Sequence, residues 1–454
     1  MSQIAFKQER EKVKEWRRYP AYKDSGVEWL GEIPSHWEVK RLKNATLLNL
    51  DTLNENTHAD YLLTYIDIGN VTSDGSVLET QEFLFEKAPS RARRKVKDGD
   101  TIISTVRTYL RAISLIEDPP ENLIVSTGFA VLTPSSEIEP QFLFRLVQSS
   151  EFVEKVVAHS EGVGYPAINP SKLACLPIWL PPLPEQQAIA QFLDRETTKI
   201  DTLVAKKERL IELLKEKRTA LISHAVTKGL NPDAPMKDSG VEWWGEVPKG
   251  WEIMPIKFAL SIPITDGPHE TPELYDEGIP FISAESIKND QIDFDKKRGY
   301  ISLEEHKRFS RKYKPQYGDV YMVKSGATTG NVARVETNQE FNIWSPLAVL
   351  RPNTDVIKTN FLFYAMKSKP FFYSVELSWS FGTQQNIGMG VISNIRIVLP
   401  PPSEQQAIAQ FLDRETAKID TLIAKTRNSI EKLKEYRTAL ISAAVTGKID
   451  VRND

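Results

Sequence analysis

One thirteen-residue sequence, EQQAIAQFLDRET, occurs twice in this chain without a single difference, at residues 185–197 and 404–416. Each copy follows a run of prolines and begins a charged segment in which apolar residues recur at intervals of three and four. That interval is typical of one face of a helix, and proline, which cannot continue a strand ladder, is well tolerated at a helix start. The repeat therefore predicts two similar helices of roughly 40 residues, each about 60 Å long.

A second repeated segment indicates that nearly the whole chain is duplicated. The sequence KDSGVEW at residues 23–29 returns at residues 237–243, and a Gly-Glu-Ile-Pro or Gly-Glu-Val-Pro sequence follows soon after each copy. The chain is thus built as segment, domain and helix, and then the same three parts again. If the two helices are antiparallel, this circular layout brings the C-terminus back near Lys23.

Between the repeats the identity is lost, but the pattern of strands is kept. A Gly-Asp turn followed by a strand is predicted at residues 97–104 and 316–323, and a short amphipathic helix at 141–157 and 360–375. Many short strands with few helices favour α+β domains with a mainly antiparallel sheet. The predicted parts are a charged N-terminal extension (1–21), a first globular domain (22–183), a first long helix (184–230), a second globular domain (231–402), a second long helix (403–447) and a C-terminal tail (448–454).

A helix of this length with one apolar stripe needs a partner, and the other copy is the obvious one. We expect the two helices to pair as an antiparallel coiled coil related by a pseudo-two-fold axis. The seam residues predicted from the apolar spacing are Ile200, Leu203, Leu210, Leu214 and Leu221 in the first helix and Ile419, Leu422, Leu433 and Leu440 in the second. A parallel pair would require the second globular domain to span the helix length, and two independent core helices are the remaining alternative.

The composition excludes several classes of protein. With 454 residues, 41% apolar and 26% charged, the chain is long enough for several domains, and it has no apolar run long enough to span a membrane. Its charged start lacks the apolar core of a secretory signal, and Cys175 is the only cysteine. These features predict a cytoplasmic protein without disulfides or thiolate zinc sites. The six histidines are scattered and predict no metal site.

No catalytic motif is convincing. The chain has neither a GxxxxGK[ST] phosphate loop nor a GxGxxG sequence after a strand. The sequence Asp-Pro-Pro-Glu at residues 118–121 is similar to the Asp-Pro-Pro-Tyr motif of amino-methyltransferases, but it lacks the tyrosine and is interpreted as a turn. The glycine-rich residues 326–331 are interpreted as a turn between strands. An enzyme with two active sites is therefore disfavoured, because no acidic cluster recurs in both halves.

Basic residues recur before the Gly-Asp turn of each half and shortly after it. Such groups can neutralise DNA phosphates, while amide, arginine and aromatic side chains of the later loops can reach bases. The candidate DNA-binding residues are Arg91, Arg93, Arg94, Lys95, Lys97, Arg107, Arg111, Tyr165 and Asn169 in the first half, and Arg311, Lys312, Lys314, Lys324, Gln384, Gln385 and Asn386 in the second. The net charge of −3 does not decide for or against nucleic acid, because the distribution of charge matters more than its sum.

Taken together, these motifs resemble the specificity subunits of type I restriction–modification systems. The resemblance rests on LPPLPEQQAIAQFLD and LPPPSEQQAIAQFLD, on the divergent domain before each, and on the two KDSGVEW segments, and it spans residues 22–446. It implies two target-recognition domains, each reading one half of a bipartite site in double-stranded DNA, with the paired helices as a spacer. The resemblance does not account for the charged stretch before Tyr22.

The resemblance also implies partners. Two methyltransferase (modification) subunits and the restriction subunits would bind this chain, and they would carry S-adenosylmethionine, ATP and Mg, so that this chain binds no cofactor and is not itself an enzyme. The alternative class is a scaffold that does not bind DNA and brings protein partners together through two globular modules on a coiled coil.

Overall fold

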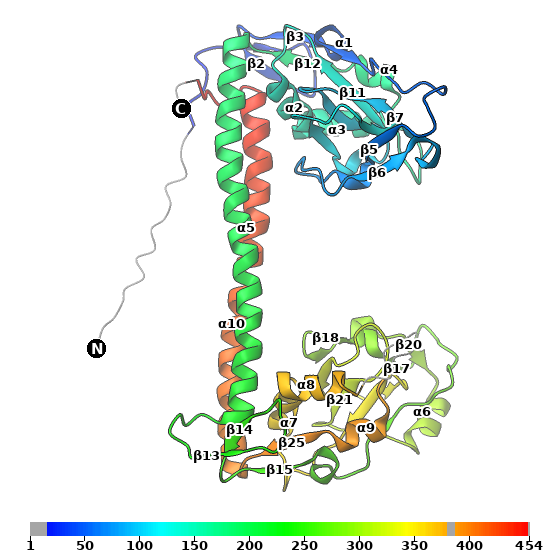
Figure 1. The fold of residues 1–454 in the computed structure, drawn as a ribbon, viewed down its shortest axis with the longest axis vertical. Helices are drawn as coiled ribbons and strands as arrows, with labels where there is room; N and C mark the ends of the chain where they lie inside the picture. The colour runs from blue at the N-terminus through cyan, green and yellow to red at the C-terminus, as the bar shows by residue number, and fades with distance from the viewer. Residues whose placement is uncertain (1–15, 379–385, 453–454) are drawn as a thin grey trace, which may run out of the picture. The chain divides into compact units, whose positions relative to one another are not determined.

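Two long helices and two globular domains make up the protein, as the sequence predicts (Figure 1). The computed structural model describes residues 16–378 and 386–452. Helix α5 spans Leu183–Lys228 and helix α10 spans Pro402–Val445. The chain forms two compact units: unit 1 is residues 1–207 with 428–454, and unit 2 is residues 208–427. Within the described residues, no helix has both the length and the apolar character needed to cross a membrane.

Unit 1 contains two four-stranded sheets. The first has the order β4-β11-β8-β9, with bounds Thr46–Leu48, Phe129–Pro134, Thr101–Ser104 and Ile113–Leu115. The second has the order β6-β5-β10-β7, with bounds Gln81–Leu84, Leu62–Ile66, Leu123–Ser126 and Ala92–Lys95. All of these pairings are antiparallel except β5 with β10, so the prediction of a mainly antiparallel sheet is confirmed. The remaining pairs and short helices are β1 (Tyr22–Asp24) with β2 (Glu32–Pro34), β3 (Glu38–Arg41) with β12 (Pro177–Leu180), α1 (Leu42–Ala45) and α4 (Pro170–Ala174).

Unit 2 repeats this architecture. Its sheets have the orders β16-β24-β21-β22 (Thr265–Asp266, Leu347–Leu350, Val320–Val323, Val332–Arg334) and β20-β17-β23 (Gly299–Ile301, Ile279–Ile282, Asn342–Ile343). Two-stranded pairs are β13 (Met236–Asp238) with β14 (Glu246–Pro248), β15 (Glu252–Pro255) with β25 (Arg396–Leu399), and β18 (Ile287–Lys288) with β19 (Gln291–Ile292). The short helices α6 and α9 span Leu303–Ser310 and Met389–Asn394.

The single amphipathic helix predicted in each half is wrong, because the structure has two helices there. Unit 1 has α2 (Pro140–Gln148) and α3 (Ser150–Ala158), and unit 2 has α7 (Thr359–Met366) and α8 (Lys369–Glu376). The chain leaves the helical conformation at Ser149 and Ser368, and each serine side chain then caps the following helix by accepting a bond from a backbone N–H. The break turns both helices of each pair onto the core.

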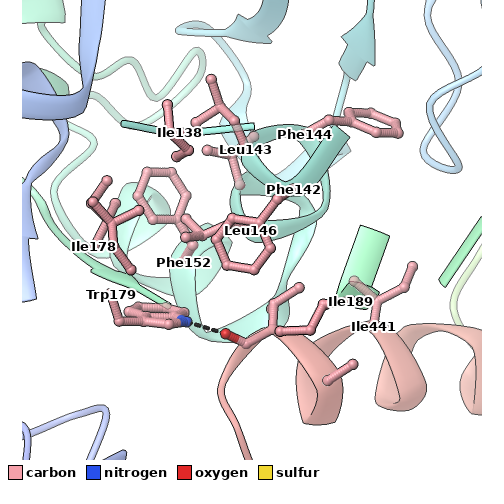
Figure 2. Packing of buried hydrophobic residues seen from close by; sticks show 14 of the residues in the cluster. Ile138, Phe142, Leu143, Phe144, Leu146, Phe152, Ile178, Trp179, Ile189 and Ile441 are labelled. Atoms are coloured by element: carbon pink, nitrogen blue, oxygen red, sulfur yellow. Dashed lines mark hydrogen bonds between the residues drawn. The ribbon is translucent and has the colours of Figure 1, made fainter. Parts of the chain in front are cut away.

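The core of unit 1 includes residues from both long helices (Figure 2). Phe142 and Phe152 lie against Ile189 of α5 and Ile441 of α10 within one buried cluster. The indole Nε1 of Trp179 on β12 donates a hydrogen bond to the carbonyl oxygen of Val445, so the end of α10 is fastened to the domain. Each fully buried large apolar side chain contributes roughly 1.5–3 kcal/mol. The domain and the helices of unit 1 therefore share one core.

The first two residues of the repeated sequence make the same contacts in both units. Glu185 Oε1 accepts a bond from Trp37 Nε1 at 3.0 Å, and Glu404 Oε2 accepts one from Trp251 Nε1 at 2.9 Å. The following glutamine donates in both units to the proline run that precedes the helix: Gln186 Nε2 lies 2.8 Å from the carbonyl oxygen of residue 181, and the matching bond of Gln405 is 2.9 Å long. The same side chains thus perform the same docking in each unit.

The two long helices are antiparallel in each unit. In unit 1, Arg437 Nε of α10 lies 2.9 Å from Asp201 Oδ1 of α5, and in unit 2, Arg218 Nε of α5 lies 3.0 Å from Asp420 Oδ1 of α10. Each contact joins the first half of one helix to the second half of the other. The predicted antiparallel pairing is therefore confirmed.

The predicted seam is wrong at three leucines. Leu203, Leu210 and Leu422 are 43%, 45% and 50% exposed, whereas Ile211 and Ile423, each one residue further along, are both 8% exposed. The buried and half-buried positions step by alternating intervals of three and four through residues 193, 197, 200, 204, 207, 211, 214, 218, 221 and 225, and through 412, 416, 419, 423, 426, 430, 433, 437, 440 and 444. The other predicted seam residues, which are Ile200, Leu214, Leu221, Ile419, Leu433 and Leu440, lie on these rows.

The chain closes on itself in unit 1, as the circular layout predicts. Helix α10 ends at Val445, and Gly447 follows it with a φ of 73°, which favours glycine. The carbonyl oxygen of Gly447 accepts a bond of 3.0 Å from Tyr22 Oη. The backbone N–H of Asp450 then donates to the carbonyl oxygen of Arg17 at 2.8 Å. The part of the N-terminal extension that the structure describes therefore binds the C-terminal tail.

Candidate nucleic-acid interface

Three loops of unit 1 meet at one end of its first sheet. The backbone N–H of Thr127 donates to the carbonyl oxygen of residue 91, and that of Thr105 donates to the carbonyl oxygen of residue 128, both at 2.8 Å. The N–H of Arg107 donates to the carbonyl oxygen of residue 166 at 2.7 Å. These bonds bring together Arg91, Arg107 and Tyr165 from distant parts of the sequence. We call this end the loop edge of unit 1 (residues 91, 105–111, 127–128 and 163–167).

The loop edge of unit 1 exposes cationic and aromatic groups together. The Arg107 guanidinium lies over the ring of Tyr165, 4.4 Å from its centroid, and Tyr165 is 66% exposed. Tyr109 is also exposed. Arg107 and Arg111 both have a left-handed backbone, with φ of 50° and 55°, which is uncommon for residues other than glycine and concentrates at functional sites. This combination suits contact with phosphates and with base edges.

Unit 2 has the equivalent edge on a different sequence. The N–H of Lys324 donates to the carbonyl oxygen of residue 346, and the N–H of Ile387 donates to that of Lys324, both at 2.8 Å. Ser325 bridges to Asn386 here, as Val106 bridges to residue 167 in unit 1. We call this end the loop edge of unit 2 (residues 266–269, 298, 312, 324–325, 344–346 and 386–387). The structure therefore places the candidates Lys312, Lys324 and Asn386 on one edge.

A buried carboxylate organises the cations of this edge. Asp266 is fully buried, and its Oδ1 lies 2.5 Å from Lys312 Nζ. Its Oδ2 lies 3.3 Å from Lys324 Nζ and 3.2 Å from His269 Nε2. Nearby, the Arg298 guanidinium lies 4.0 Å from the ring centroid of Trp344. The edge thus pairs basic groups with an aromatic ring, as in unit 1.

Other predicted residues of unit 1 lie away from its loop edge or already have partners. Lys97 precedes β8 and so lies at the opposite end of that strand from Arg107. Arg111 Nη2 lies 3.3 Å from Ser150 Oγ, and Asn169 Oδ1 accepts a bond of 2.9 Å from Ser171 N and caps α4.

The three predicted residues on β7 all have partners within the domain. Arg93 stacks on Phe85, Arg94 Nε donates to the carbonyl oxygen of Phe129, and Lys95 pairs with Asp51. Burial lowers the pKa of Arg94.

In unit 2, Lys314 pairs with Glu340 at 2.7 Å, and Arg311 is exposed after helix α6. The candidates Gln384 and Gln385 lie outside the described residues.

Both Gly-Asp turns carry buried aspartates: Asp319 is bound by Arg351 Nε at 2.7 Å, and Asp100 accepts a bond of 2.6 Å from Thr133 Oγ1. Burial raises the pKa of Asp100. These turns therefore stabilise the domains rather than present the cations beside them.

The two motifs that the sequence predicts to be turns lie between strands. Residues 118–121 connect β9 to β10, and residues 326–331 connect β21 to β22. Among the described residues, no cluster of histidine, cysteine, aspartate and glutamate could hold a metal ion.

Sequence reasoning missed Tyr109 in unit 1 and four residues of unit 2, which are Asp266, His269, Arg298 and Trp344. Their contacts join residues far apart in the chain, such as Asp266 with Lys312. The only available signal is compositional, since a tryptophan and an arginine in a polar loop region are typical of binding surfaces. It does not say which residues meet.

Each unit therefore carries a candidate edge of basic and aromatic groups at the equivalent place in its fold. Residues 34–213 and 248–432 match the family of the type I restriction modification DNA specificity domain, and the chain belongs to this family, with two copies of the domain.

Similar proteins agree with this assignment. The putative type I restriction enzyme MjaX specificity subunit of Methanocaldococcus jannaschii is 25% identical over 445 residues, covering 93% of this chain and 96% of that protein. The type I restriction enzyme EcoKI specificity subunit of Escherichia coli K12 is 21% identical over 433 residues, covering 92% and 90%.

Solved structures share the fold. A chain from a study of complex assembly and conformational transition of the type I R-M system superposes with a TM-score of 0.71 at 23% identity, covering 92% of this chain and 99% of that one. The HsdS subunit from Thermoanaerobacter tengcongensis gives a TM-score of 0.50 at 21% identity, covering 92% and 98%.

Proposed function

We propose that this chain reads a bipartite DNA target, with one half-site bound at the loop edge of each unit and with the paired helices setting the distance between the half-sites. The observation that carries the proposal is that both units build an edge of cationic and aromatic groups at the same place in the fold from different residues. Two domains that recognise different base sequences need binding edges at equivalent positions that present different side chains to the bases.

We propose further that the chain has no catalytic activity of its own and binds two methyltransferase subunits, together with restriction subunits, in the cytoplasm. The identical sequence in α5 and α10 supports two equivalent docking surfaces for two identical partners. S-adenosylmethionine, ATP and Mg would then be bound by those partners. The similarity to a chain from a study of complex assembly of the type I R-M system supports this arrangement.

The test measures DNA binding by the chain assembled with its methyltransferase subunits, across a range of salt concentrations. We expect Arg107→Ala and Arg298→Ala each to weaken binding to all sequences and to reduce the salt slope by about one. Lys97→Ala and Lys314→Ala are controls, because Lys97 lies at the opposite end of β8 from the loop edge and Lys314 is already paired with Glu340, and they should leave the slope unchanged.

Three results would speak against the proposal. If the loop-edge variants and the control variants reduced the salt slope equally, the interface would lie elsewhere. Binding without sequence preference would contradict target reading. Partner binding without DNA binding would favour the scaffold that does not bind DNA.

A further inference from the structure

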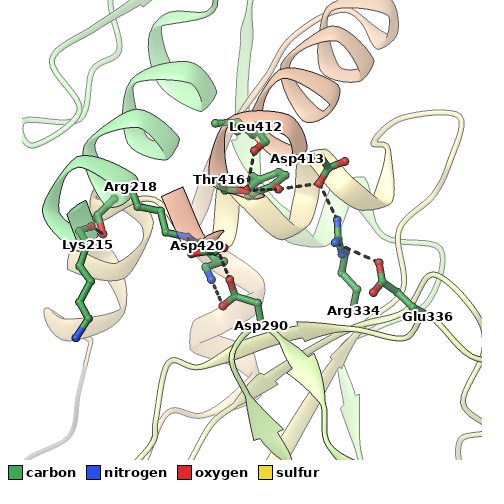
Figure 3. Close-up of polar contacts among 12 residues, drawn as sticks. Lys215, Arg218, Asp290, Arg334, Glu336, Leu412, Asp413, Thr416 and Asp420 are labelled. Atoms are coloured by element: carbon green, nitrogen blue, oxygen red, sulfur yellow. Dashed lines mark hydrogen bonds and ion pairs between the residues drawn. The ribbon is translucent and has the colours of Figure 1, made fainter. Parts of the chain in front are cut away.

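A short hairpin of unit 2 is tied to helix α5 by a buried ion network (Figure 3). The hairpin consists of β18 and β19, and its turn residues Asn289 and Asp290 both have a left-handed backbone, with φ of 50° and 70°. Asp290 Oδ2 lies 2.7 Å from Arg218 Nη2, and Asp290 Oδ1 contacts Lys367 Nζ at the end of α7. Arg218 is held in turn by Asp420 of α10. One carboxylate therefore joins the hairpin to a long helix and to a domain helix.

The network is largely removed from water. The side chains of Arg218, Lys367 and Asp290 are 18%, 16% and 28% exposed. Burial opposes the ionisation of Asp290, yet Lys367 and Arg218 hold its pKa below the ordinary value. Burial lowers the pKa of Lys367, whereas Asp290 and, to a smaller extent, Asp420 raise it, so the charge of Lys367 is tolerated mainly because of Asp290.

Unit 1 makes the equivalent connection through a backbone carbonyl oxygen, at a short hairpin turn that an antiparallel bridge between Val71 and Val77 closes. Arg437 occupies the position of Arg218 in the repeated sequence RTALIS, and Gln148, at the end of α2, occupies that of Lys367. Both side chains donate to the backbone carbonyl oxygen of Asp74, Gln148 Nε2 at 3.1 Å and Arg437 Nη2 at 3.4 Å. The hairpin contact is therefore kept in both units, while its chemistry has changed.

A second row of contacts holds the domain of unit 2 to α10 independently. Asp413 accepts a bond of 2.7 Å from Tyr364 Oη and lies 3.4 Å from Arg334 Nη1 (Figure 3). If the hairpin contact is broken, this row still attaches the domain, together with the Trp251–Glu404 bond and the buried apolar cluster that the domain shares with both long helices. Loss of the hairpin contact is then expected to loosen the orientation of the domain without detaching it.

We propose that the hairpin contact fixes the orientation of each recognition domain on the helix pair, and that Asp290 is the positioning residue for the half-site read by unit 2. This inference rests on the proposed function. Asp290 acts through Arg218 and Lys367 and does not itself touch DNA. Its role is to hold the loop edge of unit 2 at one angle to the helices, so that only one base sequence and one spacing fit.

The test uses the full chain assembled with its methyltransferase subunits. Binding is measured on the target mapped for the wild type, on targets with one base pair changed in either half-site, and on targets whose spacer is one base pair shorter or longer. A mismatch normally costs roughly 5- to 150-fold in affinity. In Asp290→Asn we expect the ratio of the affinity for the mapped target to the affinity for a mismatched target to fall at least about threefold at one half-site. The variant should also bind the targets with the shorter and the longer spacer. Discrimination at the other half-site should be unchanged.

The repeat supplies a rescue variant and a matched control. The double variant Asp290→Asn with Lys367→Gln reproduces the neutral donor of unit 1 and removes the unpaired ammonium, so it should recover most of the lost discrimination. Gln148→Leu removes one of the two donors to the Asp74 carbonyl oxygen in unit 1 and should reduce discrimination at the other half-site. If Asp290→Asn does not fold, the rescue variant and Gln148→Leu decide the question.

The outcomes separate this inference from the proposed function. If the wild type binds its target selectively and Asp290→Asn keeps the same discrimination and spacer preference, the hairpin contact does not position the domain. Effects of Asp290→Asn and Gln148→Leu on the same half-site would also overturn the inference. If the wild-type complex shows no selective binding, the proposed function fails and this inference falls with it.

Discussion

The register of the helix pair predicts opposite effects for neighbouring residues. Ile423 is 8% exposed and Leu422 is 50% exposed. Truncating a buried isoleucine to alanine costs about 2–4 kcal/mol through lost burial and the cavity left behind. Truncating a half-exposed leucine removes less buried surface and should cost under about 1 kcal/mol. We therefore expect Ile423→Ala to destabilise the protein by at least about 1 kcal/mol more than Leu422→Ala.

Both variants place alanine in the same helix, so helix propensity does not account for the difference. The assay is urea unfolding of the full chain, followed by helical circular dichroism and by hydrogen exchange of residues 402–427, which reports on unit 2 separately. Ile211→Ala and Leu210→Ala in α5 form a second matched pair. A larger loss of stability in Leu422→Ala than in Ile423→Ala would refute the seam through residues 419, 423 and 430.

Three further predictions concern individual polar groups. Trp37→Phe should destabilise unit 1 by about 1–3 kcal/mol in urea unfolding, because it leaves the buried Glu185 carboxylate without the indole donor; no change would show that this bond contributes nothing. Asp266→Asn should increase binding to non-specific DNA and steepen its salt slope by up to about one per released lysine, and a slope equal to that of the wild type would contradict the role given to this carboxylate. Since the pKa of Asp290 is lowered in the folded state, its contribution to stability is present above the unfolded pKa of about 3.9 and is lost as pH falls through the folded value. Unfolding measured from pH 5 to pH 2.5 should therefore show a smaller loss of stability in the variant Asp290→Asn with Lys367→Gln than in the wild type.

The sequence predicts the helices and their pairing because those depend on local periodicity and on an identical repeat. It does not predict the seam register reliably, because a leucine stands directly before three of the β-branched seam residues, which are Val204, Ile211 and Ile423. Hydrophobicity alone does not distinguish the two residues of such a pair, whereas the alternation of four and three does, because the step of three from Thr416 to Ile419 requires a step of four to Ile423.

The candidate interface is also predictable only in part, but the reason differs from the one that applies to the seam. Arg107, Tyr165 and Lys324 are visible as basic or aromatic residues near turns, but their meeting at one edge depends on backbone bonds between distant loops. The cluster around Asp266 has no sequence signal, because a carboxylate and the lysines that it pairs lie on different elements. The same holds for the hairpin contact of Asp290, which becomes clear only by comparison with Asp74 and Gln148 in unit 1.

The central claim is that the helix pair sets the spacing of two half-sites, and a heptad insertion tests it most directly. Seven residues inserted in α5 after Lys207 and seven in α10 after Arg427 keep the seam in register and lengthen both helices by about 10 Å. In the assembled complex, the spacer of the methylated target, read by modification-sensitive sequencing, should lengthen by about 3 base pairs at roughly 3.4 Å each. A folded, active complex that keeps the original spacer would contradict the claim.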